Sequence, residues 1–206
     1  MISLENISKR YDNAWIFKNI TLQFAPGKHY ALLGDNGSGK STLLRVIANM
    51  QSVNNGKIHY KIKEKNIAPE HFYKHYTFCA PAMDIIEDMT LVEFLQFHFS
   101  FKQSINNIHI NDIIEATGLQ DAKNNQIRNY SSGMKQRVKL AQAFFSQSDY
   151  LLLDEPCSNL DDKGIALYQE WLKNYGSHNC RTVIIASNDS REYADVDHLI
   201  YLKTYK

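Results

Sequence analysis

A glycine-rich stretch followed by a lysine and two hydroxyl residues has the spacing of a phosphate-binding loop. It reads Gly34-Asp35-Asn36-Gly37-Ser38-Gly39-Lys40-Ser41-Thr42, and we refer to residues 34–42 as the P-loop. In the pattern Gly-x4-Gly-Lys-Ser, the glycines allow sharp turns, so that successive backbone N–H groups face phosphate oxygens. We therefore expect a nucleoside triphosphate site in which Lys40 contacts the β- and γ-phosphates and the Ser41 hydroxyl binds Mg²⁺. A glycine-rich turn without a ligand is the alternative.

Two acids follow an apolar run in the second half of the chain. The run 150–153 ends in Asp154 and Glu155, which places two carboxylates at the edge of a predicted sheet, where ligands bind in open α/β folds. We expect Asp154 to contribute to the Mg²⁺ shell and Glu155 to polarise an attacking water. Solvated acids at a strand end are the alternative. Cys157 has no histidine near it in sequence and is expected to be a small buried residue rather than a nucleophile.

Hydrophobic periodicity places these residues between strands and helices. Strands are predicted at 2–7, 20–24, 29–33, 58–62, 76–80, 150–153, 182–186 and 198–202. Helices are predicted at 41–50, 90–101, 112–117, 133–145 and 164–174. The helix at 90–101 should begin with a capping box formed by Thr90 and Glu93. Gly118 should end the helix at 112–117. The P-loop thus lies between a strand and a helix, which is the context that a phosphate site needs.

The order of these elements predicts a single α/β domain over residues 1–206. Its core, 1–83 and 147–206, should be a P-loop NTPase fold, a mixed sheet flanked by helices with an N-terminal antiparallel β part. Residues 84–146 should form an inserted α-helical subdomain. No internal repeat, low-complexity tract or flexible linker interrupts the sequence.

Composition excludes several classes of protein. The apolar fraction is 44% and the charged fraction 22%, which argues against a disordered or coiled-coil chain. A net charge of +1 gives no reason to expect nucleic acid. The three cysteines, Cys79, Cys157 and Cys180, are too few and too far apart for a disulfide framework. With no signal peptide or membrane span evident, we expect a cytoplasmic protein that reaches the membrane only through a partner.

A segment upstream of the acidic run separates this chain from other P-loop proteins. Residues 130–137, Tyr-Ser-Ser-Gly-Met-Lys-Gln-Arg, resemble the signature segment of ABC-type ATPases. The acidic run continues into Ser158-Asn159-Leu160-Asp161, which is similar to the D-loop of that family. The resemblance covers essentially the whole chain.

The family resemblance implies an ATP site shared between two subunits. ATP and Mg²⁺ would lie between the P-loop of one subunit and the signature segment of the other, in a homodimer or heterodimer. Ser131, Ser132 and the N–H of Gly133 would contact the γ-phosphate across the interface, with Asp161 close by. Tyr11 would stack on adenine. Closing and opening of the dimer would drive a membrane-spanning permease, and the subunit would lie on the inner face of the cell membrane.

The chain departs from the family pattern at three places. Asn188 stands where most members have a histidine that contacts the γ-phosphate, and an amide cannot carry a proton. Ala82 stands where the family usually places a glutamine. Ser132 and Met134 replace a glycine and a glutamine of the signature. We expect ATP binding to be intact and hydrolysis, supported by Glu155, to be slow.

The sequence leaves several alternatives open. The chain could instead be a soluble ABC-type ATPase with a regulatory role, or a nucleotide switch that turns over slowly. The aromatic residues Phe94, Phe97, Phe99 and Phe101 could form the core of the helical segment or a surface for the membrane partner. Neither the transported substrate nor the direction of transport can be read from the sequence.

Overall fold

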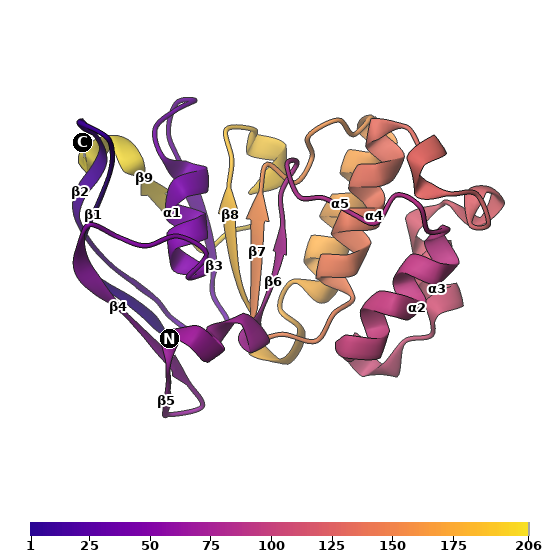
Figure 1. Ribbon diagram of the computed structural model, residues 1–206, viewed down its shortest axis with the longest axis horizontal. Helices are drawn as coiled ribbons and strands as arrows, with labels where there is room; N and C mark the ends of the chain where they lie inside the picture. Colours follow the sequence, from indigo (N-terminus) through magenta and orange to yellow (C-terminus); the bar gives the residue numbers. More distant parts are fainter. Residues whose placement is uncertain (206) are drawn as a thin grey trace.

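The structure is a computed structural model that describes residues 1–205, and its elements form two sheets with helices packed beside them (Figure 1). The strands are β1 (Ile2–Tyr11), β2 (Ala14–Phe24), β3 (His29–Leu33), β4 (Asn55–Ile62), β5 (Lys65–Ile67), β6 (Tyr76–Cys79), β7 (Tyr150–Asp154), β8 (Thr182–Ala186) and β9 (His198–Tyr201). The α-helices are α1 (Lys40–Ile47), α2 (Leu91–Phe101), α3 (Ile110–Thr117), α4 (Ser132–Phe144) and α5 (Asp162–Tyr175). Short 3₁₀ helices include η1 (Pro69–His75) and η6 (Ser190–Glu192).

The five-stranded sheet has the order β6-β7-β8-β3-β9, and every neighbouring pair is parallel. All five residues of β3, β7 and β8 are buried, because elements cover both faces of this sheet. Their carboxyl ends meet at one edge, which brings the P-loop close to the residues that follow β7 and β8. The strands predicted at 29–33 and 182–186 are confirmed, and the α/β fold class is confirmed with them.

The antiparallel sheet has the order β2-β1-β4-β5. The predictions for its first two strands, 2–7 and 20–24, were too short. β1 and β2 continue to a tight turn after Tyr11, and their pairing shifts register three times along its length. These irregularities, with Asn6 at a φ of 50°, break the alternation that a sequence pattern relies on. The short β5 was missed, because the turn before it contains Lys63 and Glu64 rather than glycine.

Two hydrophobic cores lie on opposite faces of the parallel sheet. In β7, Leu151 and Leu153 pack into the core formed with α4 and α5, whereas Tyr150 and Leu152 pack toward α1 and the antiparallel sheet. This period of two follows from the alternation of side chains along a strand. Figure 1 shows α1 between the two sheets and α4 and α5 on the other side of the parallel sheet.

The chain between β6 and β7 contains α2, α3 and α4, which lie at the end of the molecule farthest from the antiparallel sheet (Figure 1). Thr90 and Glu93 form the predicted capping box at the start of α2, and Gly118 ends α3 with a φ of 67°. The division of the chain at 84 and 146 stays a prediction. Across residues 1–205, no helix has both the length and the apolar character that crossing a membrane requires.

Two of the four phenylalanines of α2 lie in the hydrophobic core or against it, and the other two lie on the surface. Phe94 is buried, and Phe99 packs against the core formed with α4. Phe97 and Phe101 are 45% and 79% exposed, and their rings contact each other edge to face. The helix therefore contributes both to the core and to an aromatic surface.

Candidate nucleotide-binding site

The P-loop joins the carboxyl end of β3 to the first residue of α1. Gly39 has a φ of 99°, and a Cβ atom built on it would lie 2.4 Å from Cγ2 of Ile16, so only glycine fits there. The Lys40 ammonium group donates to the carbonyl oxygen of Gly34 at 2.8 Å, which keeps it within the curve of the loop. Burial lowers the pKa of Lys40, although the acidic groups of Glu155, Asp154 and Asp35 oppose this effect.

A cavity of about 300 Å³ opens along the P-loop. It is lined by Ile16, Asn36, Gly37, Gly39, Lys40, Ser41, Thr42 and Glu155. The Ser38 hydroxyl beside it is buried, and no hydrogen-bond partner for it exists within residues 1–205. A buried polar group normally has a partner, so this hydroxyl fits a loop that closes on a polar ligand. Asp35, also predicted to bind the nucleotide, does not line the cavity and instead pairs with Lys203 at 2.8 Å.

The two predicted metal ligands come together from opposite halves of the chain. The Ser41 hydroxyl donates to Oδ1 of Asp154 at 2.7 Å. Asp154 is only 4% exposed at the end of β7, and burial raises the pKa of its carboxyl while the bond from Ser41 opposes this. A hydroxyl and a carboxylate beside a phosphate loop are ligands that suit Mg²⁺. The donor set therefore fits the metal.

Glu155 and Asn188 flank the P-loop cavity from the ends of two neighbouring strands. Glu155 lines the cavity, and its N–H donates to the carbonyl of Ala186 at 2.9 Å. Its φ of 44° is uncommon for a residue with a side chain and costs of order 1–3 kcal/mol. The Asn188 amide donates to Oδ1 of Asn36 at 2.6 Å, which brings this residue to the P-loop. The predicted catalytic residues thus meet at one place.

The signature residues lie outside this cavity, at the N-terminus of α4. Ser131 caps the helix by accepting from the N–H of Met134 at 3.2 Å, and Ser131 and Ser132 are exposed. Gly133 packs closely on the loop between β7 and α5, and a Cβ atom added to it would lie 2.9 Å from the carbonyl oxygen of Asn159. Asp161 caps α5 through the N–H of Gly164 at 2.8 Å.

Tyr11 does not line the cavity along the P-loop. Its ring is 44% exposed, the ammonium group of Lys9 lies 5.3 Å from the ring centroid, and its hydroxyl contacts the amide of Gln51. Ile16 does line the cavity, although it was not predicted from the sequence. It stands in the middle of an amphipathic strand, where no local motif distinguishes it from a core residue.

Side chains of α4 connect the signature segment to two loops, and these contacts were also missed. Gln136 donates to the carbonyl of Pro156 at 2.7 Å, directly after Glu155. Lys139 donates to the carbonyl of Pro81 at 2.6 Å, next to Ala82. The acceptors are backbone carbonyls, so no pattern of residue types reveals them.

Comparison with known proteins assigns the family. The sequence profile of the family described as "ABC transporter" matches residues 17–158. The chain belongs to the ABC transporter family. It is therefore an ATP-binding cassette protein, and the resemblance inferred from the signature segment is confirmed.

Several curated proteins of this family are similar to the cassette. An uncharacterized ABC transporter ATP-binding protein of Bacillus subtilis is 32% identical over 93% of this chain and 87% of its own length. The sulfate/thiosulfate import ATP-binding protein CysA of Anthoceros angustus is 31% identical over 98% of this chain. The spermidine/putrescine import ATP-binding protein PotA of Mycoplasma capricolum is 30% identical over 93% of it. The chain spans 54% and 55% of the lengths of these last two proteins.

Solved structures show the same fold. A dimeric ATP-binding cassette in a post-hydrolysis state bound to ADP and Pi superimposes with a TM-score of 0.82 at 21% identity. The match covers 98% of this chain and 94% of that one. A structure described as the ATP-binding subunit of an ABC transporter gives a TM-score of 0.83 at 20% identity, over 98% and 85% of the two chains.

Proposed function

We propose that this cassette hydrolyses ATP with Mg²⁺ at the P-loop and uses the resulting dimer cycle to drive a membrane permease. The observation that carries the proposal is a cavity lined by both Ser41 and Glu155, with Asp154 held beside it by a hydrogen bond of 2.7 Å from Ser41. A binding site alone would not need the second acid at the mouth of the cavity.

Each residue of the site has a specific task in this proposal. The backbone N–H groups of the P-loop and the Lys40 ammonium bind the β- and γ-phosphates. Ser41 and Asp154 would hold Mg²⁺, which when bound would supply positive charge against the phosphate oxygens. The Glu155 carboxylate orients a water for in-line attack and accepts its proton.

Asn188 contributes a hydrogen-bond donor to the γ-phosphate but cannot take up a proton. Ala82 has no polar group to offer where the family pattern has a glutamine. Together they make hydrolysis slow and leave binding intact. Tyr11, which is 44% exposed, provides the surface on which adenine stacks.

A second subunit completes the site. Ser131, Ser132 and the N–H of Gly133 stand at the exposed start of a 13-residue helix, which suits the γ-phosphate bound by a partner. Asp161 follows Asn159, whose carbonyl packs against Gly133, by two residues, and we assign it to the same shared site. The partner can be a second copy of this chain or another cassette.

An aromatic groove between η1 and α2 is the surface that we assign to the permease. It encloses about 510 Å³ and is lined in part by Tyr73, Ile86, Phe97 and Phe101. These four side chains are 60%, 41%, 45% and 79% exposed, which is unusual for apolar groups that have no partner. Docking there places the cassette on the inner face of the membrane. Relatives of similar identity are named for sulfate and for spermidine import, so we assign cargo selection to the permease.

ATP turnover by the purified chain tests the proposal. We expect measurable, slow hydrolysis that requires Mg²⁺ and is lost in Glu155→Gln. The Glu155→Gln chain with ATP and Mg²⁺ should elute as a dimer on size exclusion with light scattering, whereas Lys40→Ala should remain monomeric and bind no ATP. A wild-type chain that binds ATP without turnover would instead support the nucleotide switch. A monomeric Glu155→Gln chain at saturating ATP would contradict the shared site.

The role of Asn188 can be tested separately. We expect Asn188→His to raise kcat by about tenfold or more, because an imidazole can carry charge at the γ-phosphate, with little change in the Kd for ATP. Asn188→Ala is the matched control and should lower kcat further. Equal rates for the histidine variant and the wild type would show that Asn188 does not limit turnover.

A further inference from the structure

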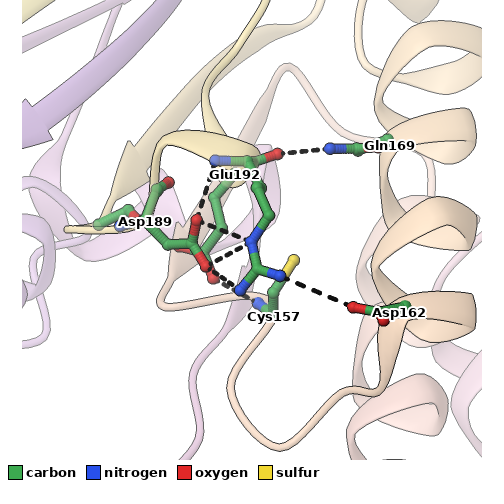
Figure 2. Close-up of polar contacts among 7 residues, drawn as sticks. Cys157, Asp162, Gln169, Asp189 and Glu192 are labelled. Carbon is green, nitrogen blue, oxygen red and sulfur yellow. Dashed lines mark hydrogen bonds and ion pairs between the residues drawn. The ribbon is translucent and has the colours of Figure 1, made fainter.

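Glu192 is a buried carboxylate that belongs to no sequence motif considered above. It lies in η6, four residues after Asn188, and is 3% exposed. Its Oε1 accepts a hydrogen bond of 2.6 Å from the backbone N–H of Cys157 (Figure 2). Burial raises the pKa of the Glu192 carboxyl to about 7, although the side chain of Ser187 and the bond from Cys157 oppose this effect. A carboxylate in such surroundings needs a specific reason to be there.

The Cys157 N–H belongs to the turn that carries Glu155. In this turn, the N–H of Glu155 donates to Ala186 and the N–H of Ser158 donates back to the carbonyl of Glu155 at 3.0 Å. Cys157 is 7% exposed, so without Glu192 its N–H would be a buried donor with no acceptor. Glu155 is also held at a φ of 44°, and such a conformation persists only where the surroundings fix it.

The backbone of η6 is itself anchored, which lets Glu192 act as a fixed acceptor (Figure 2). The Tyr168 hydroxyl of α5 donates to the main-chain carbonyl of Glu192 at 2.7 Å. The Gln169 amide donates to the carbonyl of Arg191 at 3.0 Å. The Arg191 guanidinium pairs with Asp189 at 2.6 Å and lies 3.8 Å from Asp162 at the start of α5.

We propose that Glu192 is a positioning residue for hydrolysis, which holds the Glu155 turn through the Cys157 N–H and so fixes the Glu155 carboxylate relative to the P-loop. The inference rests on the proposed hydrolytic function. Glu192 is not among the residues that line the P-loop cavity, and its hydrogen bond toward that region is made to the turn. The same carboxylate also connects the segment that bears Asn188 to the loop that leads into α5.

Three substitutions of Glu192 test this role in the full-length chain. Glu192→Ala removes the acceptor and should lower kcat about tenfold or more, because small misplacements of a catalytic group have large effects on rate. The Kd for ATP should stay within about twofold, since the P-loop is untouched. Glu192→Gln retains an acceptor oxygen of the same reach and should restore kcat to within about twofold of wild type. Glu192→Asp withdraws the acceptor by one methylene group and should give an intermediate rate.

A control separates positioning from general destabilisation. Thr90→Ala removes the N-cap of α2, has no contact with η6 or with the Glu155 turn, and should lower the Tm while leaving kcat within about twofold of the wild-type value. A wild-type kcat in Glu192→Ala overturns the inference, as does a Gln variant as slow as the Ala variant. If Glu192→Ala does not fold, the Asp variant decides the question, and a wild-type rate in it overturns the inference.

Hydrogen exchange keeps the two proposals distinguishable. A wild-type chain that does not hydrolyse ATP contradicts the proposed function but leaves the contact testable. Amide exchange in residues 155–160 should then be at least about tenfold faster in Glu192→Asp than in wild type, with exchange in the P-loop unchanged. Equal exchange in that segment overturns the positioning role.

Discussion

Glu192→Gln should make the protein more stable at pH 8 and leave its stability nearly unchanged at pH 4.5. The pKa of the Glu192 carboxyl rises from 4.5 to about 7 on folding, because the group is buried and the charges of Asp189 and Glu155 act in the same direction. The folded state therefore binds more protons than the unfolded state between these two values. The free energy of unfolding must fall as pH rises from 4.5 to 7, and it levels off above pH 7.

The size of the effect follows from the two pKa values. Each tenfold change in proton affinity corresponds to about 1.4 kcal/mol, so the ionised carboxylate costs roughly 3 kcal/mol above pH 7. Glutamine keeps the acceptor oxygen for the Cys157 N–H and has no charge to desolvate. Its NH2 group takes the place of the buried Oε2, which has no hydrogen-bond partner within residues 1–205, so about 3 kcal/mol is the upper limit of the gain. A gain of about 3 kcal/mol is a large part of the 5–15 kcal/mol by which folded proteins are typically stable.

Urea unfolding of both proteins at pH 4.5 and pH 8 measures the difference. Other groups that titrate in this range are common to both chains, so comparison of the two isolates Glu192. Glu170→Gln, an exposed change on α5, is the matched control and should alter the free energy of unfolding by less than about 0.5 kcal/mol at either pH. The reasoning is refuted if the Glu192→Gln difference is the same at both pH values, or if the variant is the less stable protein at pH 8.

Three further substitutions test individual contacts. Thr90→Ala removes the cap of α2 and should lower the free energy of unfolding by about 1 kcal/mol in urea titrations, without changing the Kd for ATP. Gly39→Ala places a methyl group against Ile16 and should abolish ATP binding in a fluorescent-nucleotide titration, and retained affinity would contradict the assigned loop geometry. Gly133→Ala pushes α4 away from Asn159 and should lower ATPase activity about tenfold with ATP affinity unchanged, although alanine favours a helix by about 1 kcal/mol over glycine.

The sequence predicts the parts of this structure that depend on local patterns. β3 and β8 are mostly apolar runs that follow turn residues, and their bounds are as expected. The contact between Ser41 and Asp154, 113 residues apart in the chain, was foreseen only because two known motifs implied it. The roles of the site residues remain predictions, although the geometry places Glu155 and Asn188 next to the P-loop.

The contacts that could not be predicted from the sequence join residues that are distant in the chain and meet only in the folded protein. Glu192 lies in a short 3₁₀ turn among polar residues, and nothing local distinguishes it from a solvated glutamate. Its burial arises because the turn after β7 packs against it, and the acceptor contact is with a backbone N–H rather than a side chain. The contact of Lys139 could not be predicted either, because its partner is the backbone carbonyl of Pro81.

The position of β3 in the sheet has a consequence for the synthesis of this protein. β3 carries the P-loop near the beginning of the chain, yet its two neighbours are β8 and β9, which are the last strands to be made. During translation, both edges of this strand, which is fully buried in the finished protein, stay unpaired for about 150 residues, or roughly ten seconds or more at typical ribosome speeds. The antiparallel sheet, whose pairings are mostly local, can form much earlier. We therefore expect ribosome-bound chains that stop before residue 182 to hold a folded β1–β2 hairpin and an aggregation-prone, unfinished nucleotide site.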